Sequence, residues 1–321
     1  MIVLGDPQSY SKYDINQPVF DLCMAWIADN VEHLNIKAVL CTGDLVDQNE
    51  NITMNRKKVN QTSAQMWDFV SRSFGKLDGK VPYIISCGNH DYGYCKAENS
   101  RTEFPKYFPM EKNTLWRDCL VGDMPNRNGD VSLENAVFEF HDRNWGDILV
   151  LTTEFAPRPE VLEWAKNFVS QEKYRNYKVI AMTHSYLRSR SADYTDNTGY
   201  GIAPQTSGKE FWEDFVKLCP NVVFVLCGHA GHPGELEDAV AYREDRNDAG
   251  RKVSQMMFNV QFLGGGWQGN GGDGWLRILE FMPDGKTVKV KTYSPLFGIS
   301  PATKHLAHRT GKIDKFDMNL E

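Results

Sequence analysis

The chain has 321 residues, of which 41% are hydrophobic and 24% charged, enough to bury one large core or two smaller ones. Its 36 Lys and Arg residues against 42 Asp and Glu residues give a formal net charge of −6 at pH 7. This charge disfavours a protein that binds a phosphate backbone, so nucleic acid is not the expected partner.

The sequence shows no run of 18 apolar residues and no export signal, so no membrane span is predicted. As given, it indicates a cytoplasmic location, whereas an exported or periplasmic location would follow if an N-terminal signal had been removed. The seven cysteines are an odd number, and several end apolar runs, so a disulfide framework is not expected.

Short apolar runs bounded by Gly, Pro, Asn or Asp recur along the first two thirds of the chain, which is typical of buried strands. Amphipathic helical patterns lie between several of them, around Phe20 to Val31, Met66 to Val70 and Leu162 to Phe168. This alternation predicts an α/β fold. The predicted strands are residues 2–4, 36–41, 81–87, 148–153, 178–182 and 222–227.

The last third of the chain has strand patterns without helices between them, which predicts a second, more antiparallel sheet. These strands are residues 239–262, 274–281 and 287–293. Residues 92–136 and 185–209 are long and polar, and loops of that length are usually functional, so both are interpreted as inserted active-site loops. Residues 1–300 are therefore predicted to form a single domain, and residues 301–321 a C-terminal tail.

Polar residues of metal-ligand type directly follow the strands of the first group. In open α/β sheets, ligands bind beyond the carboxyl ends of the strands, so these side chains are expected to meet there. The accompanying glycines would allow sharp turns toward a crowded centre. The segments read GDPQ at residues 5–8, GDLVD at 43–47, GNHD at 88–91, THS at 183–185 and GHAGH at 228–232.

Each motif alone is weak evidence, because Gly-Asp and Gly-Asn are ordinary turn dipeptides and a single histidine at a strand end is usually a loop residue. Asp47 could also be a helix N-cap, and Asp91 a turn residue. The coincidence of five such strand ends favours a metal site.

The order of these motifs resembles the calcineurin-like metallophosphoesterase superfamily, whose usual pattern is DxH, GDxxD, GNHD, H and GHxH. The resemblance covers residues 1 to about 232 by motif, and its centre, GDLVD and GNHD, is specific. It implies a four-layer αββα fold, in which a two-sheet β-sandwich is flanked by helices. It also implies that residues 1–300 form a catalytic domain with a binuclear metal centre.

The activity implied by the resemblance is hydrolysis of a small or medium organic phosphate ester, by a phosphatase or a phosphodiesterase, with a hydroxide that two metals activate. Asp44 would bridge both metals, and Asn89, His184 and His229 would complete the second site. Such mixed oxygen and imidazole ligands suit Mn²⁺, Fe²⁺ or Zn²⁺.

The resemblance gives His90 a role away from the metals. It would stabilise charge on the phosphoryl group and protonate the leaving oxygen, with Asp47 orienting its imidazole.

The first metal site, with Asp6 and Asp44, departs from the family pattern. Gln8 stands where the family has a histidine, and some members of the superfamily with a GDPQ start share this feature. An extra residue also precedes His232, so either a bulge at residues 230 and 231 brings it to the metal or it lines the pocket. Two alternatives therefore stay open: a metal- or phosphate-binding protein that kept the fold but has an impaired first site, and a nuclease.

The substrate end of the site is less defined. Tyr186, Arg188 and Arg190 follow the His184 motif and are candidate substrate-binding residues, as is Trp267. An arginine there could grip a phosphate, although solvated loop arginines are common. Trp267 could stack on an aromatic or sugar group, or act as a loop anchor.

Overall fold

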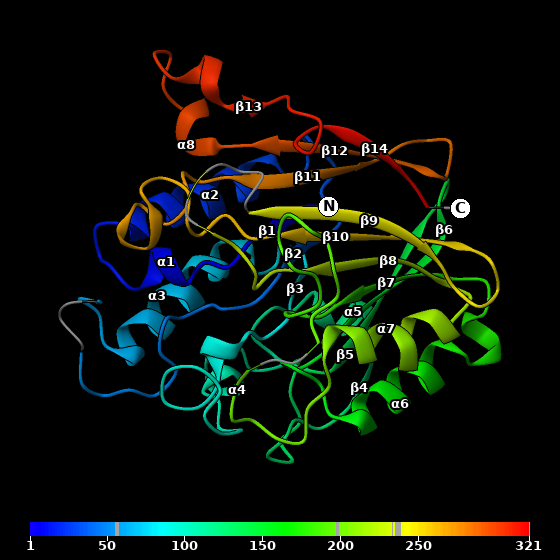
Figure 1. The fold of residues 1–321 in the computed structure, drawn as a ribbon. Coiled ribbons are helices and arrows are strands. Elements are labelled where there is room, and N and C mark those ends of the chain that lie inside the picture. The colour runs from blue at the N-terminus through cyan, green and yellow to red at the C-terminus, as the bar shows by residue number, and fades with distance from the viewer. Residues whose placement is uncertain (55–57, 197–198, 233, 235–238, 321) are drawn as a thin grey trace.

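Two sheets of seven strands pack face to face at the centre of the molecule in the computed structural model, which describes residues 1–54, 58–196, 199–232, 234 and 239–320 (Figure 1). The first sheet has the order β13-β12-β11-β1-β2-β3, with β14 beside β12. Its strands are β1 (Ile2–Leu4), β2 (Val39–Cys41), β3 (Tyr83–Ile85), β11 (Leu276–Phe281), β12 (Thr287–Tyr293), β13 (His308–Arg309) and β14 (Phe316–Asn319).

The second sheet has the order β4-β5-β6-β7-β8-β10-β9. Its strands are β4 (Leu120–Asp123), β5 (Ala136–Asp142), β6 (Gly146–Thr152), β7 (Lys178–Met182), β8 (Val222–Cys227), β9 (Val240–Arg246) and β10 (Lys252–Phe258). The strands β6, β7, β8 and β10 are mutually parallel, as are β1, β2 and β3 in the first sheet.

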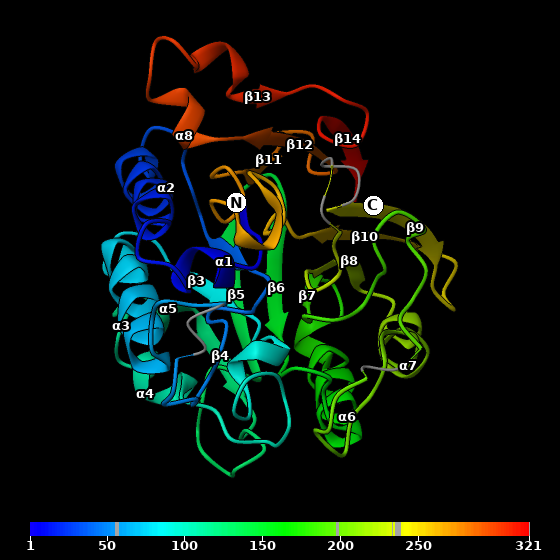
Figure 2. The same ribbon diagram turned by 60° about the vertical axis from the view of Figure 1, so that its left-hand side comes forward.

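Helices cover the outer face of each sheet. Figure 2 shows α2 and α3 on one side of the molecule and α6 and α7 on the other. This arrangement confirms the predicted four-layer αββα fold. The α-helices are α1 (Gln8–Ser11), α2 (Gln17–Asn30), α3 (Ser63–Phe74), α4 (Phe104–Tyr107), α5 (Trp116–Cys119), α6 (Pro159–Val169), α7 (Gly208–Asp214) and α8 (Pro295–Gly298).

The core forms because the helices bury apolar side chains against the sheets, whose central strands such as β2, β7 and β8 are almost entirely buried. The predicted faces of α2 and α3 are buried at Phe20, Ile27 and Met66 in a cluster that also fills the space between the sheets. A smaller cluster under α6 and α7 contains Leu162 and Phe211. Thr62 caps α3 in a capping box with Gln65, which fixes where this helix starts.

The strands of the last third do not form a sheet of their own, so that prediction was wrong. β9 and β10 extend the second sheet because β10 pairs in parallel with β8, whereas β11 pairs with β1 in the first sheet. Residues 92–136, interpreted as a loop, contain α4, α5 and β4. In the segment interpreted as a tail, β13 and β14 both pair with β12.

All seven cysteines are free thiols, and none of the helices in the described ranges is long and apolar enough to cross a membrane.

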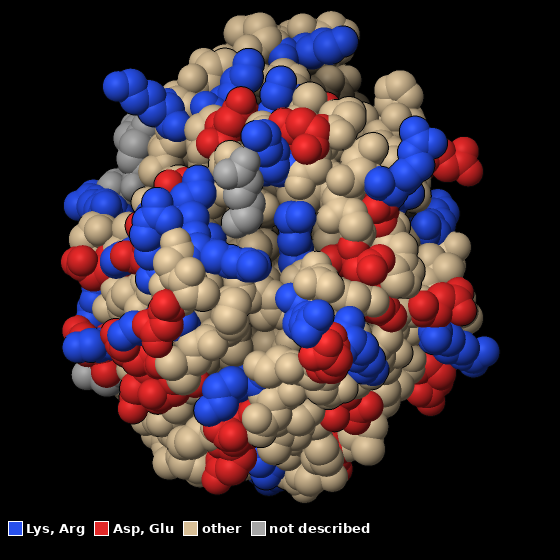
Figure 3. Space-filling model, turned by 90° about the vertical axis from the view of Figure 1, so that its right-hand side faces the viewer, with Lys and Arg blue, Asp and Glu red and all other residues tan. Residues whose placement is uncertain are grey.

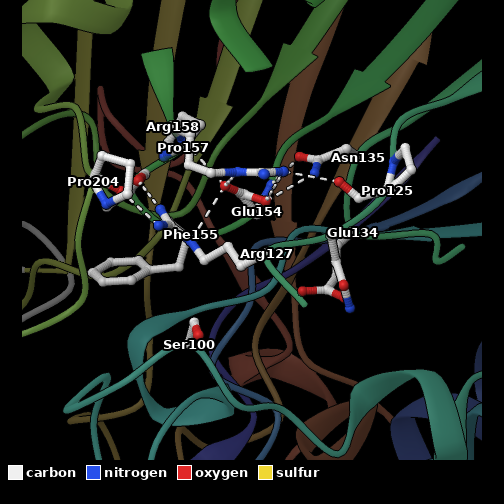
Figure 4. Close-up of polar contacts among 12 residues, drawn as sticks. Ser100, Pro125, Arg127, Glu134, Asn135, Glu154, Phe155, Pro157, Arg158 and Pro204 are labelled. Atoms are coloured by element: carbon white, nitrogen blue, oxygen red, sulfur yellow. Dashed lines mark hydrogen bonds and ion pairs between the residues drawn. The ribbon is translucent and has the colours of Figure 1, made fainter. Parts of the chain in front are cut away.

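A buried ion-pair network holds both inserted segments against the end of β6. The Glu154 carboxylate, fully buried, lies 2.9 Å from Arg158 Nε and 3.2 Å from Arg127 Nε. Figure 4 shows dashed lines from both arginine side chains to Glu154, with the end of the Arg127 side chain near Pro204. Arg127 Nη1 also donates to the Pro204 carbonyl at 2.6 Å, and its Nη2 to the Ala156 carbonyl at 2.6 Å. One side chain from the first insert thus ties the second insert to the strand end.

Replacing Arg127 with alanine is expected to lower the free energy of unfolding by about 2 kcal/mol, because it leaves the buried Glu154 carboxylate with Arg158 as its one arginine partner and removes the donor to the Ala156 and Pro204 carbonyls. The midpoint of urea denaturation measures this loss. Arg101→Ala is the matched control, because Arg101 lies in the same insert but is 72% exposed and 3.7 Å from Glu50, and it should cost less than about 1 kcal/mol. Equal midpoints for the two variants would contradict the role of the network.

Candidate active site

The carboxyl ends of β2, β7 and β8 bring three side chains together, from Asp44, His184 and His229. One ligand atom from each lies within 4.8 Å of the other two, which is close enough for all three to bind one metal ion. Asp44 Oδ2 lies 3.3 Å from His184 Nε2, and His229 Nδ1 lies 3.3 Å from the same nitrogen.

The ring of His184 is oriented by its other nitrogen. Nδ1 lies 2.7 Å from the carbonyl oxygen of Thr42, to which it donates, so Nε2 is left facing Asp44 and His229. The ring is fully buried, and Phe155, at the end of β6, packs edge-on against it with centroids 5.9 Å apart. The chain therefore presents a fixed imidazole nitrogen to this point.

Two further side chains could bind a metal, because each has a buried oxygen without a hydrogen-bond partner among the described residues. The side-chain oxygens of Gln8 and Asn89 have no hydrogen-bond partner among the described residues, although both side chains are 1% exposed. Gln8 Nε2 donates to Gln261 Oε1, which fixes the amide and leaves its oxygen unused. Buried unpaired oxygens are costly in a folded protein, and divalent cations would satisfy both.

Asp6, predicted as a ligand of the first metal, lies beside this group without being part of it. Its Oδ1 accepts a hydrogen bond from the Thr42 hydroxyl at 2.9 Å. Its Oδ2 accepts one from the main-chain N–H of His229 at 3.0 Å. Asp6 thus holds the segment after β8 in place, and its carboxylate oxygens have further lone pairs with which they could bind a cation.

The charged groups of the cluster lie close enough to shift one another's pKa values. Burial alone would raise the pKa of Asp44, but the charges of His184 and His90 hold it well below its usual range. Burial and the neighbouring Asp44 raise the pKa of Asp6 to about 7, although His184 opposes this shift. Burial and the His184 charge lower the pKa of His229 to about 3, so this imidazole is neutral and its nitrogen is free to bind a metal.

Convergence of the strand ends requires glycine. A Cβ on Gly88 would lie 2.2 Å from Asp44 Oδ1, and a Cβ on Gly228 would lie 2.2 Å from Asp6 Oδ1, so neither position admits a side chain. Asp44 and His229 themselves have positive φ angles of 52° and 68°, a strained conformation of the kind found at functional sites.

Asp91 joins the two central motifs. Its Oδ1 accepts from the N–H of Leu45 at 2.8 Å and its Oδ2 from the N–H of Gly88 at 2.8 Å. The side chain is fully buried, and burial together with Asp44 raises its pKa to about 8. Asp91 thus holds the two turns together, in line with its interpretation as a turn residue.

His90 lies at the edge of the cluster, in the 3₁₀ helix of residues 89–91. Its main-chain N–H donates to Asp44 Oδ1 at 2.9 Å. Its Nδ1 lies 2.7 Å from the main-chain carbonyl of Asp47, so the contact with Asp47 is through the backbone and not through the carboxylate. No helix starts at Asp47, and burial raises the pKa of its side chain.

A pocket of about 930 Å³ opens over these residues. His232 lines it and is exposed, and it belongs to no group of three potential ligands among the described residues. Arg188 and Trp267 also line it, whereas Arg190 is exposed at a positive φ of 61° and is not among the lining residues. The interpretation of Tyr186 as a substrate-binding residue was wrong. Its side chain is fully buried in the core under α7, and its hydroxyl donates a hydrogen bond to Gln255.

Several residues of the site were not predicted from the sequence. Gln261 and Asn259 follow β10, and the Asn259 amide donates to the carbonyl of His229 at 2.9 Å. Both residues follow an apolar run, as the predicted site residues do, and this position could have indicated them. The sequence does not show that the preceding strand, β10, pairs with β8. Tyr200 lines the pocket from the second insert and packs on Phe155 with centroids 5.5 Å apart. Lys12, fully buried, has a pKa that burial lowers to about 8, while Asp47 opposes the shift.

The fold and this cluster define a two-sheet α/β protein with candidate metal ligands at the strand ends, and a sequence model described as calcineurin-like phosphoesterase matches residues 1–234. The chain belongs to the calcineurin-like phosphoesterase family. This membership supports metal-dependent hydrolysis of a phosphoric ester. The narrower subgroup with a GDPQ start stays a prediction.

Among curated proteins, the chain is 28% identical over 327 residues to the uncharacterized protein YvnB of Bacillus subtilis (strain 168). The match covers 99% of this chain and 21% of YvnB, so the chain spans about a fifth of the length of that relative.

Among solved structures, a dimetal phosphatase from Danio rerio is similar, with a TM-score of 0.50 and 11% identity over 94% of this chain and 89% of that chain. A purple acid phosphatase from yellow lupin seeds has a TM-score of 0.48 and 12% identity over 94% of this chain and 49% of that chain.

If the first metal site is the weaker one, Gln8→His is expected to lower its dissociation constant about tenfold, because imidazole is a better ligand for transition metals than an amide oxygen. Calorimetric titration of the metal-stripped protein with Zn²⁺ measures both sites. His232→Ala is the companion variant. Because this ring is outside the ligand cluster, occupancy should stay near two ions per chain, and a fall to one would show that His232 is a ligand. An unchanged weaker site in Gln8→His would contradict the inequality of the two sites.

Proposed function

We propose that this protein hydrolyses phosphoric esters of small or medium organic molecules with a binuclear metal centre. The observation that carries the proposal is the cluster of Asp44, His184 and His229, with the unpaired oxygens of Gln8 and Asn89 beside it, at the floor of a pocket of about 930 Å³. A pocket of that size accepts an organic group in addition to a phosphate.

The ligand types divide into two sets around Asp44. Asn89, His184 and His229 would complete one site, and Asp6, Gln8 and, in the bulged arrangement, His232 the other. Two divalent cations, whether manganese, iron or zinc, would neutralise the phosphoryl oxygens and lower the pKa of a water molecule to near 7.

His90 is the proposed acid for the leaving oxygen. Its Nδ1 is engaged by the Asp47 carbonyl at 2.7 Å, so in the protonated ring Nε2–H is the free donor. The hydrogen bond from its main-chain N–H to Asp44 fixes the ring relative to the metal ligands. Asp47 acts in this proposal as a positioning residue, through its carbonyl and through the negative charge near the ring.

Cationic side chains around the pocket would attract and orient an anionic ester. Lys58, Lys96 and Arg188 line it, and all three are exposed. These groups suit a phosphate of either kind, so the proposal covers both monoesters and diesters.

One observation favours a second candidate, a metal- or phosphate-binding protein with an impaired first site. His232 lies outside the ligand cluster found among the described residues. A nuclease is less well supported. The net charge is −6, and Figure 3 shows acidic and basic side chains interspersed on one face of the molecule, without a continuous basic surface.

Asp44→Asn is expected to lower hydrolysis by roughly 10³-fold or more, because a neutral amide cannot balance the charge of two cations. Turnover of p-nitrophenyl phosphate and bis(p-nitrophenyl) phosphate with added Mn²⁺ tests this, together with the metal content of the protein. Near-normal turnover in the reconstituted variant would refute the binuclear proposal. A wild-type protein that binds metal but hydrolyses neither ester would favour the binding protein.

His90→Ala is expected to leave metal content almost unchanged while lowering kcat by roughly 10²- to 10⁴-fold for esters with poor leaving groups. The loss should shrink for activated aryl esters, because their leaving oxygens need little protonation. A plot of log kcat against the pKa of the leaving group measures this in both proteins. Equal losses across the series would argue for an electrostatic or structural role of His90.

A further inference from the structure

A buried lysine lies behind the pocket wall, outside the groups that the proposed mechanism uses. Lys12 follows α1 and is fully buried, and its ammonium has no hydrogen-bond partner among the described residues. A buried cation without hydrogen bonds is costly, so other interactions must offset its lost hydration. One of them is with the charge of Asp47, and the closest ring contact is with Trp267, because the ammonium lies 3.3 Å from the centroid of its ring.

The two faces of the Trp267 indole have different surroundings. Trp267 is half-buried and lines the pocket, whereas Lys12 is fully buried and is not among the lining residues. The ammonium therefore covers the face that is turned into the protein. The pocket side is left for a ligand, with the Phe262 ring tilted beside it at a centroid distance of 5.5 Å.

The short 3₁₀ helix that carries Trp267, residues 266–268, is fastened to the segment after α1. The Tyr13 hydroxyl donates to the side chain of Gln268, and Asn16 Nδ2 donates to the Gly269 carbonyl at 2.7 Å. A ring held in this way loses little freedom when it binds a ligand, so its surface is preorganised.

Trp267 also has a defined place relative to the proposed chemistry. Its ring centroid lies 6.3 Å from that of His90, the proposed acid for the leaving oxygen. A group bonded to that oxygen would therefore reach the open indole face.

We propose that Trp267, backed by the Lys12 ammonium, is a stacking platform for a flat, electron-rich ring in the leaving group of the ester, such as a nucleobase. The inference rests on the proposed phosphoesterase function and adds the class of organic group. Stacking on an aromatic side chain is favourable for any base and tolerant of its identity.

The charge of Lys12 decides which ligands the platform prefers. A cation on one face of an aromatic ring draws electron density toward it, so the opposite face attracts a second cation less and an electron-rich ring more. Lys58, Lys96 and Arg188 add positive charge around the same pocket. The platform therefore selects against a trimethylammonium group, which a bare tryptophan face would bind.

Adenosine 5′-monophosphate and ribose 5-phosphate test the platform, because they share the leaving oxygen and differ only in the base. Calorimetric dissociation constants at pH 7 should favour the nucleotide about 5- to 100-fold in the wild type. Trp267→Ala should bring the ratio near one, and Trp267→Phe should restore most of it. Trp164→Ala is the matched control, because Trp164 packs on Phe168 in α6, outside the pocket lining, and should keep the wild-type ratio.

Phosphocholine tests the part assigned to Lys12. In Lys12→Met, which keeps the side-chain length without the charge, binding of phosphocholine should strengthen relative to the nucleotide. An unchanged ratio of these two affinities would overturn the role of Lys12, and a nucleotide preference that survives Trp267→Ala would overturn the platform.

These binding measurements separate the inference from the proposed function. Ester hydrolysis without any Trp267-dependent nucleotide preference refutes the platform alone. A Trp267-dependent preference in a protein that hydrolyses none of the esters supports the platform and refutes the hydrolase.

Discussion

The burial of the Asp44 carboxylate is the constraint on which the rest of the site depends. A carboxylate removed from water must be balanced by donors and positive charge, and here these come from the His90 N–H and from the His184 ring. The residues that meet this demand come from β3 and β7, in different sheets. One buried charge thus joins residues that follow strands of both sheets.

The same constraint explains the backbone around the site. Asp44 adopts a positive φ, and Gly88 approaches it so closely that no side chain fits there. Asp91 then binds the N–H groups of both turns and prevents them from relaxing apart. Local strain is accepted because the surrounding hydrogen bonds over-determine the conformation.

The sequence predicted the fold class, and it singled out Asp44, His184 and His229, which the structure brings together, because both rest on local signals. A buried strand is an apolar run, and Asp44 or His184 is recognisable from the residues just before it. What the sequence did not reveal is pairing between distant segments. β10 lies beside β8, and that contact alone places Asn259 at His229, although no pattern within residues 252–261 indicates it.

The interpretation of Tyr186 failed for a related reason. Alternation along a chain does not say which face of a turn meets the solvent, and the helix α7 that covers this ring begins more than twenty residues later. Lys12 was missed because a lysine in an amphipathic segment is normally exposed. Only the three-dimensional packing shows that it is covered by the distant segment of residues 266–268.

Gln8 and Lys12 are joined by the first turn of α1, where the N–H of Lys12 donates to the carbonyl of Gln8 at 3.1 Å. One turn of helix thus carries both a candidate metal ligand and the cation beneath the pocket wall. A substitution that shifts this turn would change metal preference and choice of organic group together. Metal preference and choice of organic group are therefore expected to change together when this turn is substituted. Substitutions in the inserted segments, residues 92–136 and 185–209, would change the substrate range without affecting α1.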